Sequence, residues 1–158
     1  MKKGFTIVEL VVATALVMVL LSVVLLAINI PEKQNKAMDV KRISDLSLLD
    51  SAINQYRMDN QGYPDTRNVL RISTLLPSGN TQLESSLSGW IGQDLSKYLP
   101  RMPTDPVNDA TYHYSYIQNG SGYELNARLE FLTDQMQNDG GNDTNAYEMG
   151  SNLLLISP

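Results

Sequence analysis

The chain contains no cysteine and only one histidine among its 158 residues. Without cysteine it has no disulfide framework, no CxxC redox pair and no thiolate metal site. A single histidine excludes a multi-histidine metal centre and leaves little for a catalytic triad. Twelve Lys and Arg against seventeen Asp and Glu give a net charge of −5, which does not suit a nucleic-acid-binding surface. These absences weigh against the common enzyme classes but not against a structural part.

A long uncharged run lies close to the N-terminus. Residues 10–30 carry no charge, and a helix of that length reaches about 30 Å, the thickness of the hydrocarbon core of a bilayer. A buried core helix is the first alternative, but the polar remainder of the chain offers too little apolar surface to enclose it. A removable secretory signal is the second, but the run is longer than the usual apolar core of about 7–15 residues. We therefore expect a retained membrane span.

One acidic residue stands in the apolar stretch. Glu9 is surrounded by apolar neighbours, where an acidic side chain costs about 2.5–3.5 kcal/mol on insertion scales. Taken alone, Glu9 is either a tolerated carboxylate near the headgroups or a paired functional group. It is not alone, because the N-terminal string MKKGFTIVEL resembles the class III signal of type IV prepilins and type II secretion pseudopilins. That signal has a short basic leader ending in Gly, then Phe, then Glu at the fifth mature position, and Gly4, Phe5 and Glu9 match it.

The resemblance implies a processing and assembly history. A prepilin peptidase would remove a leader of residues 1–4 by cutting between Gly4 and Phe5, and would methylate the new Phe5 amine to give N-methylphenylalanine. Residues 5–30 would form a transmembrane helix that becomes the filament core, and residues 31–158 a globular pilin-like domain. Glu9 would act in assembly by meeting the Phe5 amine of a neighbouring subunit. The fold implied is α+β and type IV pilin-like, with a long N-terminal helix, half membrane span and half amphipathic, packed on a small antiparallel sheet.

The residues after the span fit such a domain. Pro31 predicts a kink or a short break, because proline removes a helical hydrogen bond and clashes with the preceding turn. An amphipathic helix is expected over about 32–58, and a variable loop over about 59–110 that includes a short helix at 89–98 around the sole tryptophan, Trp90. The helix has an apolar stripe at helical spacing, which should face a sheet. The stripe consists of Val40, Ile43, Leu46, Leu49, Ile53 and Tyr56.

Alternating residues predict a β-hairpin over about 111–130, with turn residues at 119–122. Its tyrosines, Tyr112, Tyr114 and Tyr116, are expected to pack in the core, since basic residues for a base-stacking platform are lacking nearby. His113 has no acid–base partner visible in the sequence and is expected to point outward. The last segment, 131–158, should be a polar C-terminal loop with a possible strand at 152–156.

The same loop raises the question of a metal ion. Asp139, Asn142 and Asp143 surround two glycines and could supply hard oxygen ligands to Ca²⁺. Major pseudopilins carry a calcium site near their C-terminal loops, so the resemblance allows one here, although the spacing is not that of an EF-hand. An ordinary solvated turn is the alternative. No other cofactor is expected.

The sequence therefore predicts a structural subunit, not an enzyme: a pilin of a type IV pilus-like filament. Its implied partners are copies of itself in a helical filament, the prepilin peptidase, the pilus or type II secretion assembly platform, and the membrane. The expected location is a single pass in the cytoplasmic membrane with the C-terminal domain outside the cytoplasm, then a surface pilus or a periplasmic pseudopilus. A pseudopilin of a type II secretion system is the alternative, although Val107-Asn108-Asp109 stands where a Trp-Gly-Asn-Pro type phrase is expected after Asp105-Pro106. A single-span anchored binding domain or enzyme is the third possibility.

Overall fold

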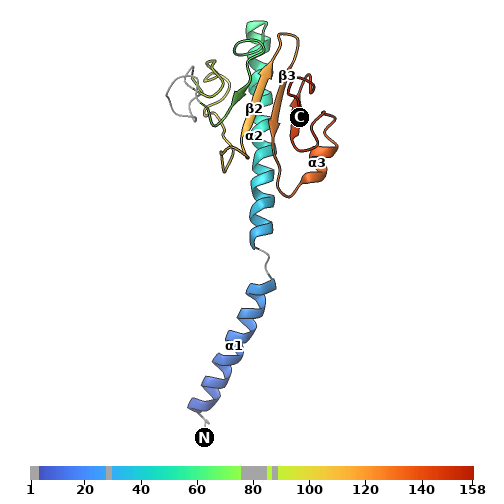
Figure 1. The fold of residues 1–158 in the computed structure, drawn as a ribbon. Coiled ribbons are helices and arrows are strands. Elements are labelled where there is room, and N and C mark those ends of the chain that lie inside the picture. Colours follow the sequence, from blue (N-terminus) through green and yellow to red (C-terminus); the bar gives the residue numbers. More distant parts are fainter. Residues whose placement is uncertain (1–3, 28–29, 76–84, 87–88) are drawn as a thin grey trace. The chain divides into compact units, whose positions relative to one another are not determined.

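The computed structural model describes residues 4–27, 30–75, 85–86 and 89–158. The chain divides into two compact units, Met1–Gln34 and Asn35–Pro158. Along the chain the elements are α1 (Ile7–Ala27), α2 (Ile30–Asn60), β1 (Arg71–Ile72), β2 (Tyr114–Gln118), β3 (Tyr123–Ala127), α3 (Thr133–Gln137) and β4 (Tyr147–Gly150), drawn in Figure 1. Of the predicted leader, only Gly4 falls within the described residues.

Helix α1 is apolar on every face. The window Ile7–Val24 has a mean hydropathy of 2.8 and none of it is buried, so α1 is long and apolar enough to cross a membrane. Its two hydroxyl side chains after the first turn are satisfied within the helix: Thr14 donates to the Val11 carbonyl at 2.9 Å, and Ser22 donates to the Val19 carbonyl at 2.7 Å. This local bonding removes the cost of placing a bare hydroxyl in an apolar environment.

Helix α2 contains Pro31 in its first turn. There proline costs little, because the amide it lacks would have no partner inside the helix. Helix α1 ends at Ala27 and α2 begins at Ile30, and residues 28–29 between them lie outside the described part of the chain, so the break expected near Pro31 stays a prediction.

The predicted apolar stripe is confirmed at its centre and wrong at its start. Leu46, Leu49 and Ile53 are completely buried, whereas Val40 is 54% exposed. The core-facing positions one and two turns earlier are Asp39 and Arg42, both fully buried. The buried face thus begins with two charged residues, which a search for apolar periodicity passes over.

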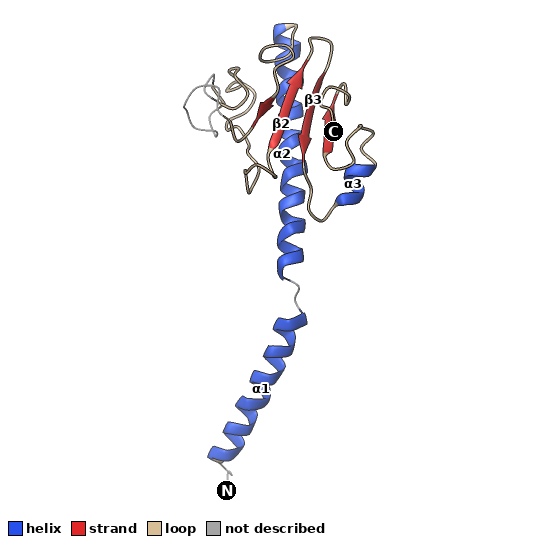
Figure 2. Cartoon of the chain, viewed as in Figure 1, coloured by secondary structure: helices blue, strands red, loops and turns tan. Residues whose placement is uncertain are grey.

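Four antiparallel strands form the sheet in the order β1-β2-β3-β4, with α2 running along one face (Figure 2). The predicted hairpin is confirmed: Tyr114 pairs with Ala127, and Tyr116 with Leu125. All four are buried in the core beside α2, so the two tyrosines are packing residues. At the hairpin turn, Gly120 has a φ of +89°, a conformation that a residue with a Cβ rarely adopts.

Two predicted elements are wrong. Residues 89–98 form bends and turns rather than a helix, although Trp90 is buried as expected and its Nε1 donates to the Pro103 carbonyl at 2.8 Å. Residues 152–156 do not form a strand, and the final strand is β4. The amides of Leu155 and Ile156 donate instead to one carboxylate oxygen of Glu124, at 2.7 and 2.9 Å. This side-chain acceptor takes the place of a neighbouring strand.

His113 precedes β2 and is partly buried. Its Nδ1 lies 3.1 Å from the Asp109 carbonyl, within the loop that leads into the strand. His113 therefore has a local backbone contact and no acid–base partner among the described hydrogen bonds.

The burial of Leu49 makes a testable prediction. Leu49→Ala should lower the free energy of unfolding by about 2–5 kcal/mol, because it deletes a fully buried side chain and leaves a cavity. Urea unfolding of a truncated chain beginning near Glu32 measures this, with Val40→Ala as the matched control on the exposed face of α2. Equal, small losses for both variants would show that α2 does not bury this face.

Candidate assembly site

Of the N-terminal residues singled out by the sequence, Glu9 forms hydrogen bonds at the start of α1, and its partner is Thr6. One carboxylate oxygen of Glu9 accepts the backbone N–H and the hydroxyl of Thr6, both at 2.8 Å. The Glu9 N–H in turn donates to the Thr6 hydroxyl at 3.2 Å. This reciprocal pattern is a capping box, in which an N-cap Thr and a Glu three residues later satisfy each other's amides. Glu9 therefore has a local partner within its own chain.

The two residues of the expected cleavage point make no such contacts. Phe5 is 81% exposed, and a Cβ built on Gly4 would meet no atom within 4 Å. The fold therefore does not itself require glycine at position 4. Phe5 and Glu9 are four residues apart in the sequence, and no side-chain hydrogen bond or ion pair among the described residues joins them.

A buried charge cluster, which we call the Arg42 cluster, joins three parts of the globular unit. Arg42 on α2 binds Asp105 through two nitrogens, at 2.7 and 3.2 Å, and its third contact reaches Asp39 at 2.9 Å. The same nitrogen binds Glu130 at 2.9 Å. The Tyr112 ring lies 4.7 Å from the guanidinium carbon. Three carboxylates and one ring thus surround an arginine side chain that is fully buried.

The electrostatics of the cluster favour the charged arginine. Burial alone would lower the pKa of Arg42, but the hydrogen bonds and charges of Asp105, Glu130 and Asp39 more than offset it and hold the pKa above its usual value. Asp39 also accepts the backbone amides of Glu130, Phe131 and Leu132 at 2.6–3.1 Å. The sequence analysis missed this cluster, although the spacing of 39, 42, 46, 49 and 53 places both charges on the core-facing side of α2.

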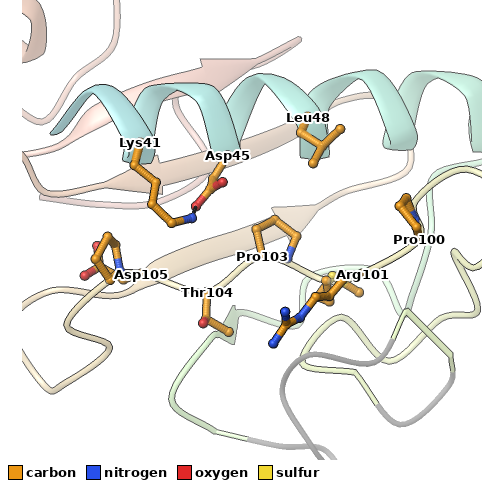
Figure 3. A pocket seen from close by; sticks show the side chains of 10 residues that line it. Lys41, Asp45, Leu48, Pro100, Arg101, Pro103, Thr104 and Asp105 are labelled. Carbon is orange, nitrogen blue, oxygen red and sulfur yellow. Dashed lines mark hydrogen bonds and ion pairs between the residues drawn. The ribbon is translucent and has the colours of Figure 1, made fainter. Parts of the chain in front are cut away.

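An open groove of about 470 Å³ lies between α2 and residues 100–106. Figure 3 shows Lys41, Asp45 and Leu48 on α2 facing the loop that carries Arg101 and Thr104. Lys41 binds Asp45 at 2.5 Å, and the Tyr114 hydroxyl donates to the same carboxylate oxygen at 2.8 Å. The groove's central carboxylate is therefore engaged, and among the described residues that line the groove no nucleophile stands beside a free base.

The three residues considered as calcium ligands, Asp139, Asn142 and Asp143, all make hydrogen bonds within the C-terminal region. Both oxygens of Asp139 accept backbone amides, from Gly141 at 2.9 Å and Glu148 at 2.8 Å. Asp143 accepts the Asn145 amide at 2.8 Å. With the oxygen and nitrogen of its side-chain amide exchanged, Asn142 donates to the Leu153 carbonyl and to a carboxylate oxygen of Glu148. Within the described ranges no group of three or more His, Cys, Asp or Glu could hold a metal ion. These side chains serve the loop's own hydrogen bonds, and a calcium site in this loop stays a possibility raised by the resemblance alone.

Taken together, an apolar N-terminal helix and a helix-backed antiparallel sheet define a pilin-like α+β fold. The chain belongs to the family of type II secretion system (T2SS) protein G, whose model matches residues 29–147. It is similar to the type II secretion system core protein G of Klebsiella pneumoniae, with 31% identity over 66% of this chain and 69% of the relative. The corresponding figures are 27%, 76% and 76% for Pseudomonas aeruginosa, and 28%, 74% and 71% for Vibrio cholerae. No solved structure matches significantly.

These relatives reverse the order of the two functions predicted from the sequence. They favour the type II secretion pseudopilin over the type IV pilus subunit. The missing Trp-Gly-Asn-Pro type phrase after Asp105-Pro106 was therefore a poor argument against the pseudopilin. In this chain Asp105 holds the buried Arg42, and its oxygen also accepts the Val107 amide at 2.8 Å.

The Arg42 cluster gives a second prediction. Arg42→Met should cost about 3–5 kcal/mol of unfolding free energy, because it leaves buried carboxylates without their counter-charge. Arg101→Met, at an exposed arginine beside the groove, is the control and should change stability by less than about 0.5 kcal/mol. Trp90 fluorescence during urea unfolding reports both. A loss below 1 kcal/mol for Arg42→Met, on the same scale, would contradict the assigned role.

Proposed function

We propose that this chain is a pseudopilin of a type II secretion system, a structural subunit of a periplasmic pseudopilus. The observation that carries the proposal is the contrast between the two units. The globular unit closes a core around residues such as Leu46, Trp90 and Tyr116, whereas every described side chain of α1 from Ile7 to Val24 is exposed. Such a helix needs another apolar environment, which is lipid before assembly and neighbouring copies of α1 afterwards.

The proposed location and partners follow from this. The chain waits as a single-pass protein in the cytoplasmic membrane, with its globular unit outside the cytoplasm, and then enters a helical filament of its own copies. Its further partners are the prepilin peptidase and the type II secretion assembly platform. The N-terminal string supports the same history, because Gly4, Phe5 and Glu9 match the class III signal in type and spacing.

A type IV pilus subunit is the second candidate, since that signal is common to both classes. Deletion of the gene in its host separates them. A pseudopilin predicts that exoproteins accumulate in the periplasm while surface pili are unchanged. Loss of surface filaments with normal secretion would instead support the pilus subunit.

Processing gives the third prediction. Gly4→Leu should leave an uncleaved precursor in the membrane, because the peptidase site must take the chain beside the scissile bond and Gly4 has no packing role in the fold. Mass spectrometry of the N-terminus, with and without co-expressed prepilin peptidase, measures it. Lys3→Gln, at the residue before Gly4, is the matched control, and this variant should still be cut. A native N-terminus at Met1 would contradict the proposed processing.

Glu9 is proposed to set the axial register of assembly. After cleavage, Phe5 would carry a positive amine, and each of the two charges is unfavourable alone in an apolar core. Pairing Glu9 of an incoming subunit with the Phe5 amine of its neighbour removes much of that penalty only at the correct stagger. The Thr6 bonds hold the carboxylate at the helix start until that partner arrives.

The fourth prediction separates the charge of Glu9 from its capping role. Glu9→Val should leave membrane insertion intact yet sharply reduce filament formation, and Glu9→Asp should be partly tolerated. Glu9→Gln is the sharper test, because glutamine keeps the capping box but loses the charge. Filament yield by electron microscopy, without wild-type subunits, is the measurement. Abundant filaments from Glu9→Gln would mean that capping alone explains the residue.

A further inference from the structure

The turn between β2 and β3 carries the one Asn-Gly dipeptide of the chain, Asn119-Gly120. In an unfolded chain such a dipeptide modifies itself. The Gly120 nitrogen loses its proton and bonds to the side-chain carbon Cγ of Asn119, and the Asn119 Nδ2 leaves as ammonia. Water then opens the five-membered imide to give aspartate, or isoaspartate, in which the backbone runs through the side-chain carbon. Glycine makes the ring closure easy, because it has no side chain to hinder it.

The attacking nitrogen is held by a neighbouring side chain. The Gly120 N–H donates to Gln118 Oε1 at 2.7 Å. Gln118 is only 2% exposed, and its Nε2 donates to the Asp65 carbonyl at 2.8 Å, so its side-chain amide is fixed at both ends. The Gly120 proton can be lost only when this bond opens, which is also what protects a bonded amide from hydrogen exchange.

The side chain under attack is held as well. Asn119 Oδ1 accepts three donors, which are the Ser121 N–H at 3.0 Å, the Ser121 hydroxyl at 2.8 Å and the Gly122 N–H at 2.9 Å. The Asn119 N–H donates to the Gly122 carbonyl at 3.0 Å and closes the turn. Ring closure has to carry Cγ to the Gly120 nitrogen, and this movement pulls Oδ1 away from donors that lie further along the turn.

Exclusion of water does not protect this site. Gly120 and Ser121 are exposed, and Asn119 is only half-buried. We propose that the hydrogen bonds of the β2–β3 turn protect Asn119 from deamidation, so that an exposed and reactive dipeptide stays unmodified in the folded protein. The protection has two parts, one at the Gly120 nitrogen and one at the Asn119 side chain, and both are lost when the turn unfolds.

The C-terminal segment depends on this turn. Directly after it, the Tyr123 carbonyl accepts the backbone amides of Ser151 and Asn152, at 3.0 and 3.2 Å. A Cβ on Gly122 would stand 2.7 Å from the Asn152 Cβ, so the two segments are closely packed. Isoaspartate at position 119 would lengthen the backbone of the turn by one carbon and displace this contact. Protection of Asn119 therefore also preserves the site on which residues 151–152 rest.

The fifth prediction compares the folded and the unfolded chain. The full chain in detergent micelles is incubated at mildly alkaline pH, and peptide mass spectrometry measures the deamidated fraction at Asn119. The same chain in urea is the reference, with unfolding of the globular unit followed by Trp90 fluorescence. The folded chain should deamidate at least about tenfold more slowly, because several hydrogen bonds must open first. Equal rates in the folded and unfolded chain would overturn the proposal.

A single variant tests the hydrogen bonds themselves. Ser121→Ala removes one of the three donors to Asn119 Oδ1 and should speed deamidation of the folded chain by about 2- to 10-fold, the factor for one lost hydrogen bond. Ser96→Ala is the matched control, because Ser96 is also exposed and bonds the side chain two residues earlier, Asp94, through its hydroxyl and its N–H. The control should leave the rate at Asn119 unchanged. A Ser121→Ala rate equal to the wild type, or below it because the donors activate the carbonyl, would overturn the proposal.

Discussion

The globular unit depends on placing one guanidinium group where water cannot reach it. Arg42 must find its acceptors inside the protein, and it takes them from α2 itself, from the loop at Asp105 and from the end of the hairpin at Glu130. Asp39 also fixes the segment that leads into α3, because its carboxylate accepts the backbone amides of Phe131 and Leu132. If any of these segments moved away, a buried charge would be left unpaired, which is strongly destabilising. The apolar contacts around Leu46 and Trp90 supply stabilisation, but the Arg42 cluster decides which segments meet.

The first unit is built on an opposite rule. Along α1 the described side chains bury nothing, and its hydroxyl groups are bonded to its own backbone. The apolar side chains of such a helix have to be covered by its surroundings, because the rest of its own chain does not bury them. The chain thus combines a globular unit that has a buried core with an apolar helix whose described side chains are exposed, and in the proposed function lipid or neighbouring copies would cover that helix. Membership of the protein G family of type II secretion is consistent with that division.

The sequence predicted the features that depend on periodicity. The apolar run, the amphipathic helix and the Tyr114–Tyr116 hairpin all follow from which residues recur on one face. It failed where a polar side chain replaces a backbone partner. Residues 152–156 read as a strand because they are apolar, but the acceptor for their amides is Glu124, a residue far away in the sequence. The Arg42 cluster was missed for a related reason, because hydropathy counts a buried charge as an exposed one. Gly4, Phe5 and Glu9 were predicted from a motif, and their roles stay predictions, because no contact among the described residues tests them.

The capping box also sets the residue at which α1 begins. Because Thr6 is the cap, the helix begins at Ile7: the Thr6 carbonyl accepts the first helical hydrogen bond, from the Leu10 amide at 3.1 Å, and Gly4 and Phe5 lie before the helix. Peptide bonds inside a helix are poor protease substrates, since the backbone has to unwind before it can enter a catalytic cleft. In the processing proposed above, the bond between Gly4 and Phe5 lies just beyond the cap and is presented already unwound. A carboxylate that later guides assembly would then first keep the cutting site open, and the same side chain would serve two consecutive steps in the life of the subunit.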